Sequence, residues 1–279
     1  KKEMPLEDEL GDILQKARDG KAWSREDLVR ATDLPQDDIQ RIENYQLTPA
    51  DSDVLKLASA LDLNGPALIK IAQELWEPNE PADDVEFDLV CLNVFMGEYP
   101  VNCYLLCCKV TGETAIVDTG ANPKTIINKA REMGVCPNKI LLTHAHPDHA
   151  GGLGELSKTF DCPTYIDHKE PKPKGSDNFK IVKDGDELTL GKLRIKCIET
   201  PGHTVGGVSY LINESLLSGD VIFAGSMGRA NSSWKELFNS ITQKVLRLPD
   251  DTGIFPGHGP STTVRQEKEH NPFFIESFR

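Results

Sequence analysis

The stretch Thr-His-Ala-His-Pro-Asp-His-Ala-Gly-Gly at residues 143–152 decides how this chain is interpreted. Four potential metal ligands lie within six positions of it: His144, His146, Asp148 and His149. The apolar run at 139–142 predicts a buried strand just before the cluster. The cluster is therefore expected on a loop at a strand end, where a rigid scaffold commonly displays functional groups. Because imidazole and carboxylate groups bind zinc, iron or manganese, the stretch predicts a metal site.

Four further motifs repeat these residue types along the second half of the chain. They are Val117-Asp118-Thr119-Gly120, Pro201-Gly202-His203-Thr204, Ser218-Gly219-Asp220 and Pro256-Gly257-His258-Gly259. With residues 143–152, this pattern resembles the signature of the metallo-β-lactamase superfamily, from about residue 85 to the end. One site then accounts for five of the seven histidines. The resemblance implies an αββα sandwich of the α/β class, with a metal site at one end.

The resemblance also implies a role for each motif residue. The implied ligands are His144, His146 and His203 for one metal ion, Asp148, His149 and His258 for a second, and Asp220 as the bridge between them. Asp118 would orient a ligand or the nucleophilic water, and a turn-capping role at a strand end is the alternative for it. Two divalent ions are therefore the expected cofactors, and the ligand types suit zinc, iron and manganese alike.

Such a site would activate water for hydrolysis. Two ions about 3.5–4 Å apart can share a water molecule, whose pKa falls to about 7 at favourable zinc sites. The resulting hydroxide would attack an electrophilic carbonyl, and Asp148, which is anionic and close, would shuttle a proton. Asp148 and Asp118 are therefore the catalytic candidates, and a small molecule is the expected substrate.

The chain resembles most closely the glyoxalase II-like branch, whose members hydrolyse thioesters such as hydroxyacylglutathione. The closer resemblance rests on residues 225–231 after Asp220 and on residues 256–262 with 269–274. Arg229 would bind a substrate carboxylate or form a structural salt bridge. Asn231, the second substrate-binding candidate, stands where related enzymes often carry Asp. The function that this branch implies is metal-dependent hydrolysis of a thioester.

Two other functions remain open. A persulfide dioxygenase-like oxidoreductase, which resembles glyoxalase II in sequence, would use a single iron held by His144, His203 and Asp220. A regulator would sense a metabolite with its metal domain and bind DNA or protein with its N-terminal helices. The ligand residues by themselves do not separate these functions from hydrolysis.

Residues 1–76 predict a small all-α domain. A helical period of apolar residues begins near residue 6, Ser24 opens a capping-box-like start, and three prolines favour further helix starts. The pattern, including the turn at 32–35 and the run at 57–61, resembles the phage-repressor/Cro type of helix-turn-helix domain. That family places the helix beginning near Pro35 in the DNA major groove.

The charge of the N-terminal region argues against DNA binding. Residues 1–80 hold 10 Lys and Arg against 18 Asp and Glu, a net charge of −8, and the would-be recognition helix begins with Asp37 and Asp38. DNA is therefore a possible but disfavoured partner. A protein contact or a homodimer is favoured instead. The acidic, Pro-rich residues 77–84 predict a linker, so the expected domains are 1–76 and 85–279.

Within residues 85–279 the apolar runs and turns predict an interleaved set of elements. Strands are expected at 85–91, 102–108, 114–117, 139–142, 163–166, 193–198, 208–212 and 215–217, and helices at 123–133, 234–246 and 264–278. The polar loop at 169–177 is expected to be solvated. His168 and His270 fit no ligand motif and are expected to be structural or solvent-facing.

The totals set further limits. A net charge of −13 argues against partners such as nucleic acid and anionic membranes, and no apolar run is long enough for a membrane span. The seven cysteines are odd in number and form no CxxC motif, so they are expected to be reduced and buried in the core. Reduced cysteines suit the cytoplasm, which is the expected location.

Overall fold

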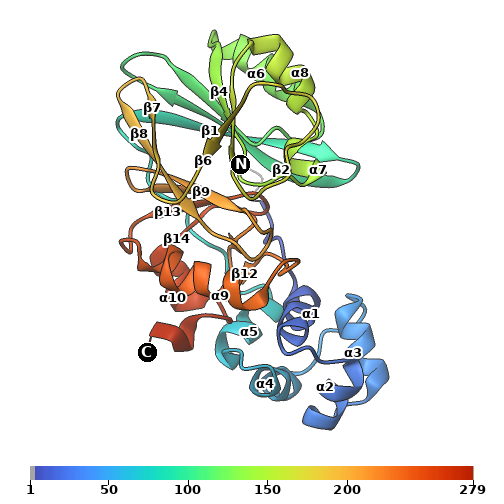
Figure 1. Ribbon diagram of the computed structural model, residues 1–279. Coiled ribbons are helices and arrows are strands. Elements are labelled where there is room, and N and C mark those ends of the chain that lie inside the picture. Colours follow the sequence, from blue (N-terminus) through green and yellow to red (C-terminus); the bar gives the residue numbers. More distant parts are fainter. Residues whose placement is uncertain (1–3, 279) are drawn as a thin grey trace.

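The computed structural model describes residues 4–278 and contains two six-stranded sheets packed face to face (Figure 1). Residues 1–3 and 279 of the two predicted domains lie outside the described residues. The first sheet has the order β1-β2-β3-β4-β5-β6 and the second has the order β14-β13-β10-β9-β8-β7. The strands of the first sheet are β1 Phe87–Met96, β2 Tyr99–Cys108, β3 Thr114–Val117, β4 Pro137–Leu141, β5 Thr164–Asp167 and β6 Phe179–Val182. The remaining strands are β7 Glu187–Leu190, β8 Leu193–Glu199, β9 Val208–Ile212, β10 Ser215–Gly219, the hairpin β11 Ile222–Phe223 and β12 Ser226–Met227, β13 Gly253–Pro256 and β14 Thr262–Thr263.

Helices cover the outer face of each sheet. They are α6 Pro123–Met133, the short α7 Pro147–Ala150, α8 Leu153–Phe160, α9 Trp234–Gln243 and α10 Val264–His270. Alternating side chains on the strands decide the layers. On β2, Leu106 enters the core between the sheets, whereas Leu105 enters the core beneath α6 and α8. On β10, Leu217 faces the first sheet and Leu216 faces the helices of the second. The order of layers is therefore helix, sheet, sheet, helix.

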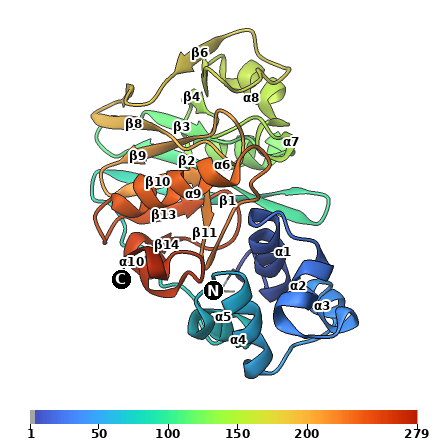
Figure 2. The same cartoon turned by 60° about the horizontal axis from the view of Figure 1, so that its bottom comes forward.

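Five further helices, which we call the helical segment, lie beside α10 and the β11–β12 hairpin (Figure 2). They are α1 Leu10–Gly20, α2 Arg25–Thr32, α3 Gln36–Glu43, α4 Asp51–Ala60 and α5 Gly65–Ala72. The expected capping box opens α2, where Ser24 Oγ accepts from the Asp27 N–H and Asp27 accepts from the Ser24 N–H. Leu14 and Leu28 of the helical segment belong to the same hydrophobic cluster as Phe274. The segment and the outer layer of the second sheet therefore share one core.

Buried polar groups also join the helical segment to the second sheet. Lys16 on α1 forms a buried ion pair with Asp8, and its Nζ donates to the Met227 carbonyl oxygen over 2.7 Å. The Ser226 hydroxyl donates to the same Asp8 carboxylate. Because each partner is satisfied only in this arrangement, these contacts fix how α1 meets the β11–β12 hairpin.

Several predicted elements lie where the sequence places them, and α6, β3 and β9 have the predicted bounds. The helix predicted at 264–278 is wrong beyond His270, because Pro272 disfavours a helical conformation at Asn271, and the chain resumes as a 3₁₀ turn at Ile275–Phe278. The helix predicted at 234–246 ends at Gln243, before a 3₁₀ turn at Val245–Arg247. The strands β6 and β7 were not predicted, because these edge strands expose polar side chains and lack an apolar run.

All seven cysteines are unpaired, and the prediction of burial is wrong for Cys91 and Cys136, which are exposed. Across residues 4–278, no helix combines the length and the apolarity that crossing a bilayer requires.

Candidate metal centre

The predicted ligands all follow strands and converge at one end of the sandwich. Asp118 follows β3, residues 144–149 follow β4, His203 follows β8, Asp220 follows β10 and His258 follows β13. The strands β3 and β4 are parallel, as are β10 and β13. The carboxyl ends of parallel strands meet at the same edge, so ligands distant in sequence become neighbours.

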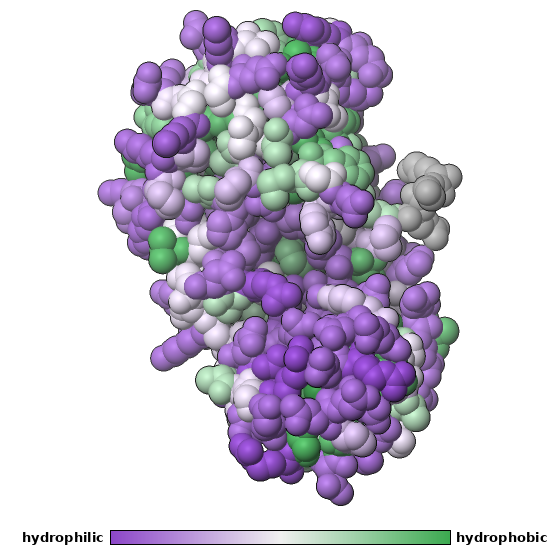
Figure 3. All heavy atoms as spheres, turned by 90° about the vertical axis from the view of Figure 1, so that its right-hand side faces the viewer, coloured by the Kyte–Doolittle hydropathy of each residue, from purple (hydrophilic) through white to green (hydrophobic). Residues whose placement is uncertain are grey.

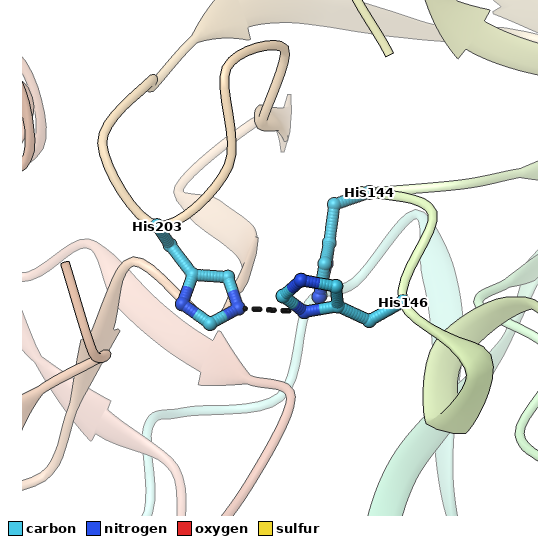
Figure 4. Close-up of side chains that lie close together, drawn as sticks. All are labelled: His144, His146 and His203. Carbon is cyan, nitrogen blue, oxygen red and sulfur yellow. Dashed lines mark hydrogen bonds between the residues drawn. The ribbon is translucent and has the colours of Figure 1, made fainter. Parts of the chain in front are cut away.

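The first ligand group is His144, His146 and His203, whose ligand atoms lie within 4.8 Å of one another. Figure 4 shows the three rings turned toward one another, with His144 and His146 on one loop and His203 on another. His203 Nδ1 donates to the Arg229 carbonyl oxygen over 2.8 Å, which leaves its Nε2 for the cluster. His144 Nε2 is buried and makes no hydrogen bond. A buried nitrogen without a partner is costly, and a bound cation would satisfy it.

The second ligand group is Asp148, His149, Asp220 and His258. His149 Nδ1 lies 2.8 Å from Asp118 Oδ2, and His258 Nδ1 donates to the Pro100 carbonyl oxygen over 2.9 Å. Both Nε2 atoms therefore face the cluster, and they lie only 3.4 Å apart. Burial on its own would lower the pKa of both rings, but the carboxylates around them, Asp220 above all, raise it, to about 10 for His258. The second group is therefore an environment that favours positive charge.

Asp220 lies between the two groups. Its Oδ1 is 3.2 Å from His149 Nε2, and its Oδ2 is 3.4 Å from His258 Nε2 and 3.5 Å from His203 Nε2. Burial on its own would raise the pKa of Asp220, but His149 and His258 hold it well below its usual range. The carboxylate is thus anionic and in reach of both groups, as a bridging ligand requires.

The donor set fits divalent metal ions. Burial, together with the neighbouring His149, holds the pKa of His144 well below its usual range, so this ring is neutral and offers a lone pair. Neutral imidazoles and carboxylates are ligands that zinc, iron and manganese accept. The structure therefore brings together all seven residues that the sequence predicted as ligands, and the ligation itself remains a prediction.

Asp118 lies directly behind His149. Its buried carboxylate accepts from the Thr143 N–H over 2.8 Å, from the Thr143 hydroxyl over 2.7 Å and from His149 Nδ1 over 2.8 Å. Metal-binding histidines commonly donate their second N–H to a carboxylate, which fixes the ring. This geometry supports the ligand-orienting role for Asp118 over simple turn capping.

The predicted substrate residues lie at the edge of the first group. Arg229 is adjacent to the cluster through its carbonyl oxygen, and its guanidinium, 48% exposed, lies 4.0 Å from Asp12 on α1. The Tyr45 hydroxyl donates to the same Asp12 over 2.6 Å. Asn231 is exposed. The Arg229 guanidinium thus lies near a structural partner, Asp12, and is also accessible to a ligand, so both predicted roles stay open to it.

Two contacts of the centre were missed in the sequence. Glu7 Oε1, from the segment before α1, lies 4.0 Å from His258 Nδ1. Glu170 is buried, so the prediction of a solvated loop at 169–177 is wrong at this residue. Neither carboxylate belongs to a recognisable motif, so only the packing of distant segments reveals them.

The two remaining histidines lie outside both ligand groups. His168 is 37% exposed and its Nδ1 lies 3.4 Å from Asp167 Oδ2. The His270 ring packs on Trp76, with ring centroids 5.2 Å apart. Both positions agree with the expectation of structural or solvent-facing rings.

Comparisons with known proteins identify the family. The model of the Metallo-beta-lactamase superfamily matches residues 96–258, which carry most of both sheets and every ligand position. The probable metallo-hydrolase YqgX of Bacillus subtilis is 34% identical over 200 residues, covering 64% of this chain and 94% of that protein. Hydroxyacylglutathione hydrolase GloC of Haemophilus influenzae is 30% identical over 182 residues, covering 57% and 86%.

A solved structure adds a metal to this comparison. The crystal structure of TTHA1623 in a di-iron-bound form superimposes with a TM-score of 0.58 and 30% sequence identity, covering 66% of this chain and 100% of that chain. The helices α1–α5 precede the matched region. By fold, ligand positions and sequence, the chain belongs to the metallo-beta-lactamase superfamily.

Proposed function

We propose that this protein is a hydrolase that binds two divalent metal ions and cleaves a thioester. The observation that carries the proposal is the position of Asp220, whose two oxygens lie within 3.5 Å of imidazole nitrogens from both ligand groups. Two ions held by these residues would activate water at neutral pH and polarise the substrate carbonyl.

The side chains of the chain itself would orient the reactants and move the proton. Asp148 Oδ2 lies 3.6 Å from His149 Nε2 and 3.4 Å from His258 Nε2, with the side chain 23% exposed. It is therefore a carboxylate that both borders the second group and reaches solvent, as a proton carrier must. Asp118 would keep His149 in the tautomer that presents Nε2.

The choice of a thioester rests on similarity and on one side chain. Residues 225–231 resemble the glyoxalase II-like branch, and the Haemophilus hydroxyacylglutathione hydrolase is 30% identical to this chain. The half-exposed Arg229 guanidinium offers a bidentate site for a carboxylate on the thiol portion of the substrate.

We infer that the helical segment, whose sequence pattern resembles a helix-turn-helix domain, contacts protein rather than DNA. The first turn of its helix α3 carries the exposed Asp37 and the half-buried Asp38. The buried Glu43 engages Arg18 and Arg25, which removes two cations from any phosphate contact. The face in Figure 3 is largely hydrophilic over the helical segment, and acidic side chains contribute to it. Phosphate contacts normally require a basic surface.

The test combines metal analysis with turnover. Protein purified without added metal is analysed by mass spectrometry for metal per chain, and its hydrolysis of lactoylglutathione is measured with and without chelator. Two metals with chelator-sensitive hydrolysis support the proposal. A single iron, no hydrolysis and oxygen uptake with a persulfide substrate would instead support the dioxygenase. Metal-loaded protein that hydrolyses no thioester refutes the substrate class.

A further inference from the structure

The buried Glu170 touches both loops that carry the first ligand group. Its Oε2 accepts from the Ala145 N–H over 3.0 Å, between His144 and His146. Its Oε1 accepts from the Gly206 N–H over 2.9 Å, three residues after His203. One carboxylate thus links the loop after β4 to the loop after β8, which belong to different sheets.

The surroundings leave Glu170 little freedom to move. It follows β5 in a turn closed by the Glu170 N–H and the Asp167 carbonyl oxygen, 3.2 Å apart. Gly206 packs against this turn so closely that a Cβ at position 206 would lie 2.5 Å from Glu170 N and 2.9 Å from Glu170 Cγ. The side chain is 7% exposed by residue, so water does not compete for its two bonds.

We propose that Glu170 is a positioning residue, which clamps the two loops so that His144, His146 and His203 converge on one metal ion. A carboxylate suits this task because it has two acceptor oxygens, and each of the two loops presents one backbone N–H donor. The inference rests on the proposed metal centre and does not depend on the substrate.

Replacing Glu170 by Gln tests the clamp with little change in volume. The Gln side chain retains a single acceptor oxygen. Its NH₂ group would therefore face the second backbone N–H, and two donors cannot form a hydrogen bond. One loop is then released, and the affinity for the ion of the first group is expected to fall about 10- to 100-fold, the usual effect of losing a partner behind a metal ligand. Gly206→Ala, which pushes the turn away from the loop, should cause the same selective loss.

The experiment measures ions retained per chain during dialysis against a graded chelator, with zinc as the probe. Wild type is compared with E170Q, H203A and H258A, and with the double variants E170Q/H203A and E170Q/H258A. The matched control is Asp186→Asn, whose carboxylate also accepts a backbone N–H, that of Lys183 over 2.8 Å, within a turn apart from both ligand loops. Melting temperatures of all variants report on general damage to the fold.

The clamp predicts that E170Q loses the same ion as H203A. The E170Q/H203A variant should then behave like H203A, whereas E170Q/H258A should retain neither ion, and the Asp186 control should retain both. An E170Q protein with wild-type retention overturns the inference, and so does one that loses both ions equally. If wild type binds a single ion, the two-ion proposal is contradicted. The clamp is then tested separately, because it still requires E170Q to behave like H203A. A wild type with no ion overturns both.

Discussion

Replacing Asp118 by Asn should weaken one metal ion selectively. Asp118 has a left-handed backbone, with φ of 56°, which Asn tolerates well, so the backbone should stay in place. The Asp118 carboxylate accepts three hydrogen bonds, two from Thr143 and one from His149 Nδ1. The single amide oxygen of Asn would serve the Thr143 N–H, which leaves its NH₂ group facing His149.

The magnitude follows from the tautomer of His149. With a donor opposite Nδ1, the proton of the ring moves to Nε2, the atom that faces His258 and Asp220. A protonated Nε2 cannot bind a metal ion, and loss of an orienting carboxylate typically costs about 10- to 100-fold in affinity. That loss corresponds to about 1.4 to 2.7 kcal/mol for the ion of the second group.

Zinc titration in competition with a chromophoric chelator measures both affinities at constant pH. The matched control is Asp161→Asn, which makes the same change at another left-handed Asp, with φ of 48°, on the exposed end of α8. We expect the control to titrate like wild type. If the Asp118 variant also titrates like wild type, or loses the ion of the first group instead, the tautomer argument is refuted.

Three further changes test other parts of the structure. Burial raises the pKa of Glu267 to about 7, so the free energy of unfolding should fall as pH rises from about 4.5 through 7. The Glu267→Gln variant should lack this part of the fall, which amounts to up to about 3 kcal/mol. Urea titrations of wild type and variant at pH 5 and pH 8 measure the difference. Lys16→Met leaves Asp8 buried without its partner and should cost about 3–5 kcal/mol in chemical denaturation. Gly257→Ala places a Cβ 2.2 Å from Asp220 Oδ1, so metal analysis should show loss of bound ions; full retention would contradict the packing.

Local patterns predicted the parts of the molecule whose partners lie nearby in sequence. The ligands of residues 144–149 follow an apolar strand directly, so their common loop was visible without a structure. The helix α6 was predicted with its bounds because a proline begins it and Gly134 ends it in a left-handed conformation. The convergence of His203 and His258 on that loop came only from the family resemblance.

Contacts between distant segments could not be predicted from these patterns. Glu170 stands in a loop rich in Lys and Pro, and nothing in its neighbours distinguishes a clamp from a solvated side chain. Lys16 reaches a carbonyl oxygen 211 residues away, at Met227. In the sequence, Lys16 looks like any other cation on an amphipathic helix. Its burial could not be predicted, because a charged side chain is buried only with a partner, and that partner lies outside the local pattern.

These contacts make the helical segment part of the scaffold of the metal centre. Its removal would expose the core side chains of α9 and Phe274, and would leave the Met227 carbonyl oxygen without Lys16. Met227 lies two residues before Arg229, whose carbonyl oxygen holds His203 in position. Movement of the β11–β12 hairpin would therefore reach a ligand of the first group through the backbone. A helical segment that only docked DNA would not need this buried attachment, which supports a role in shaping the site.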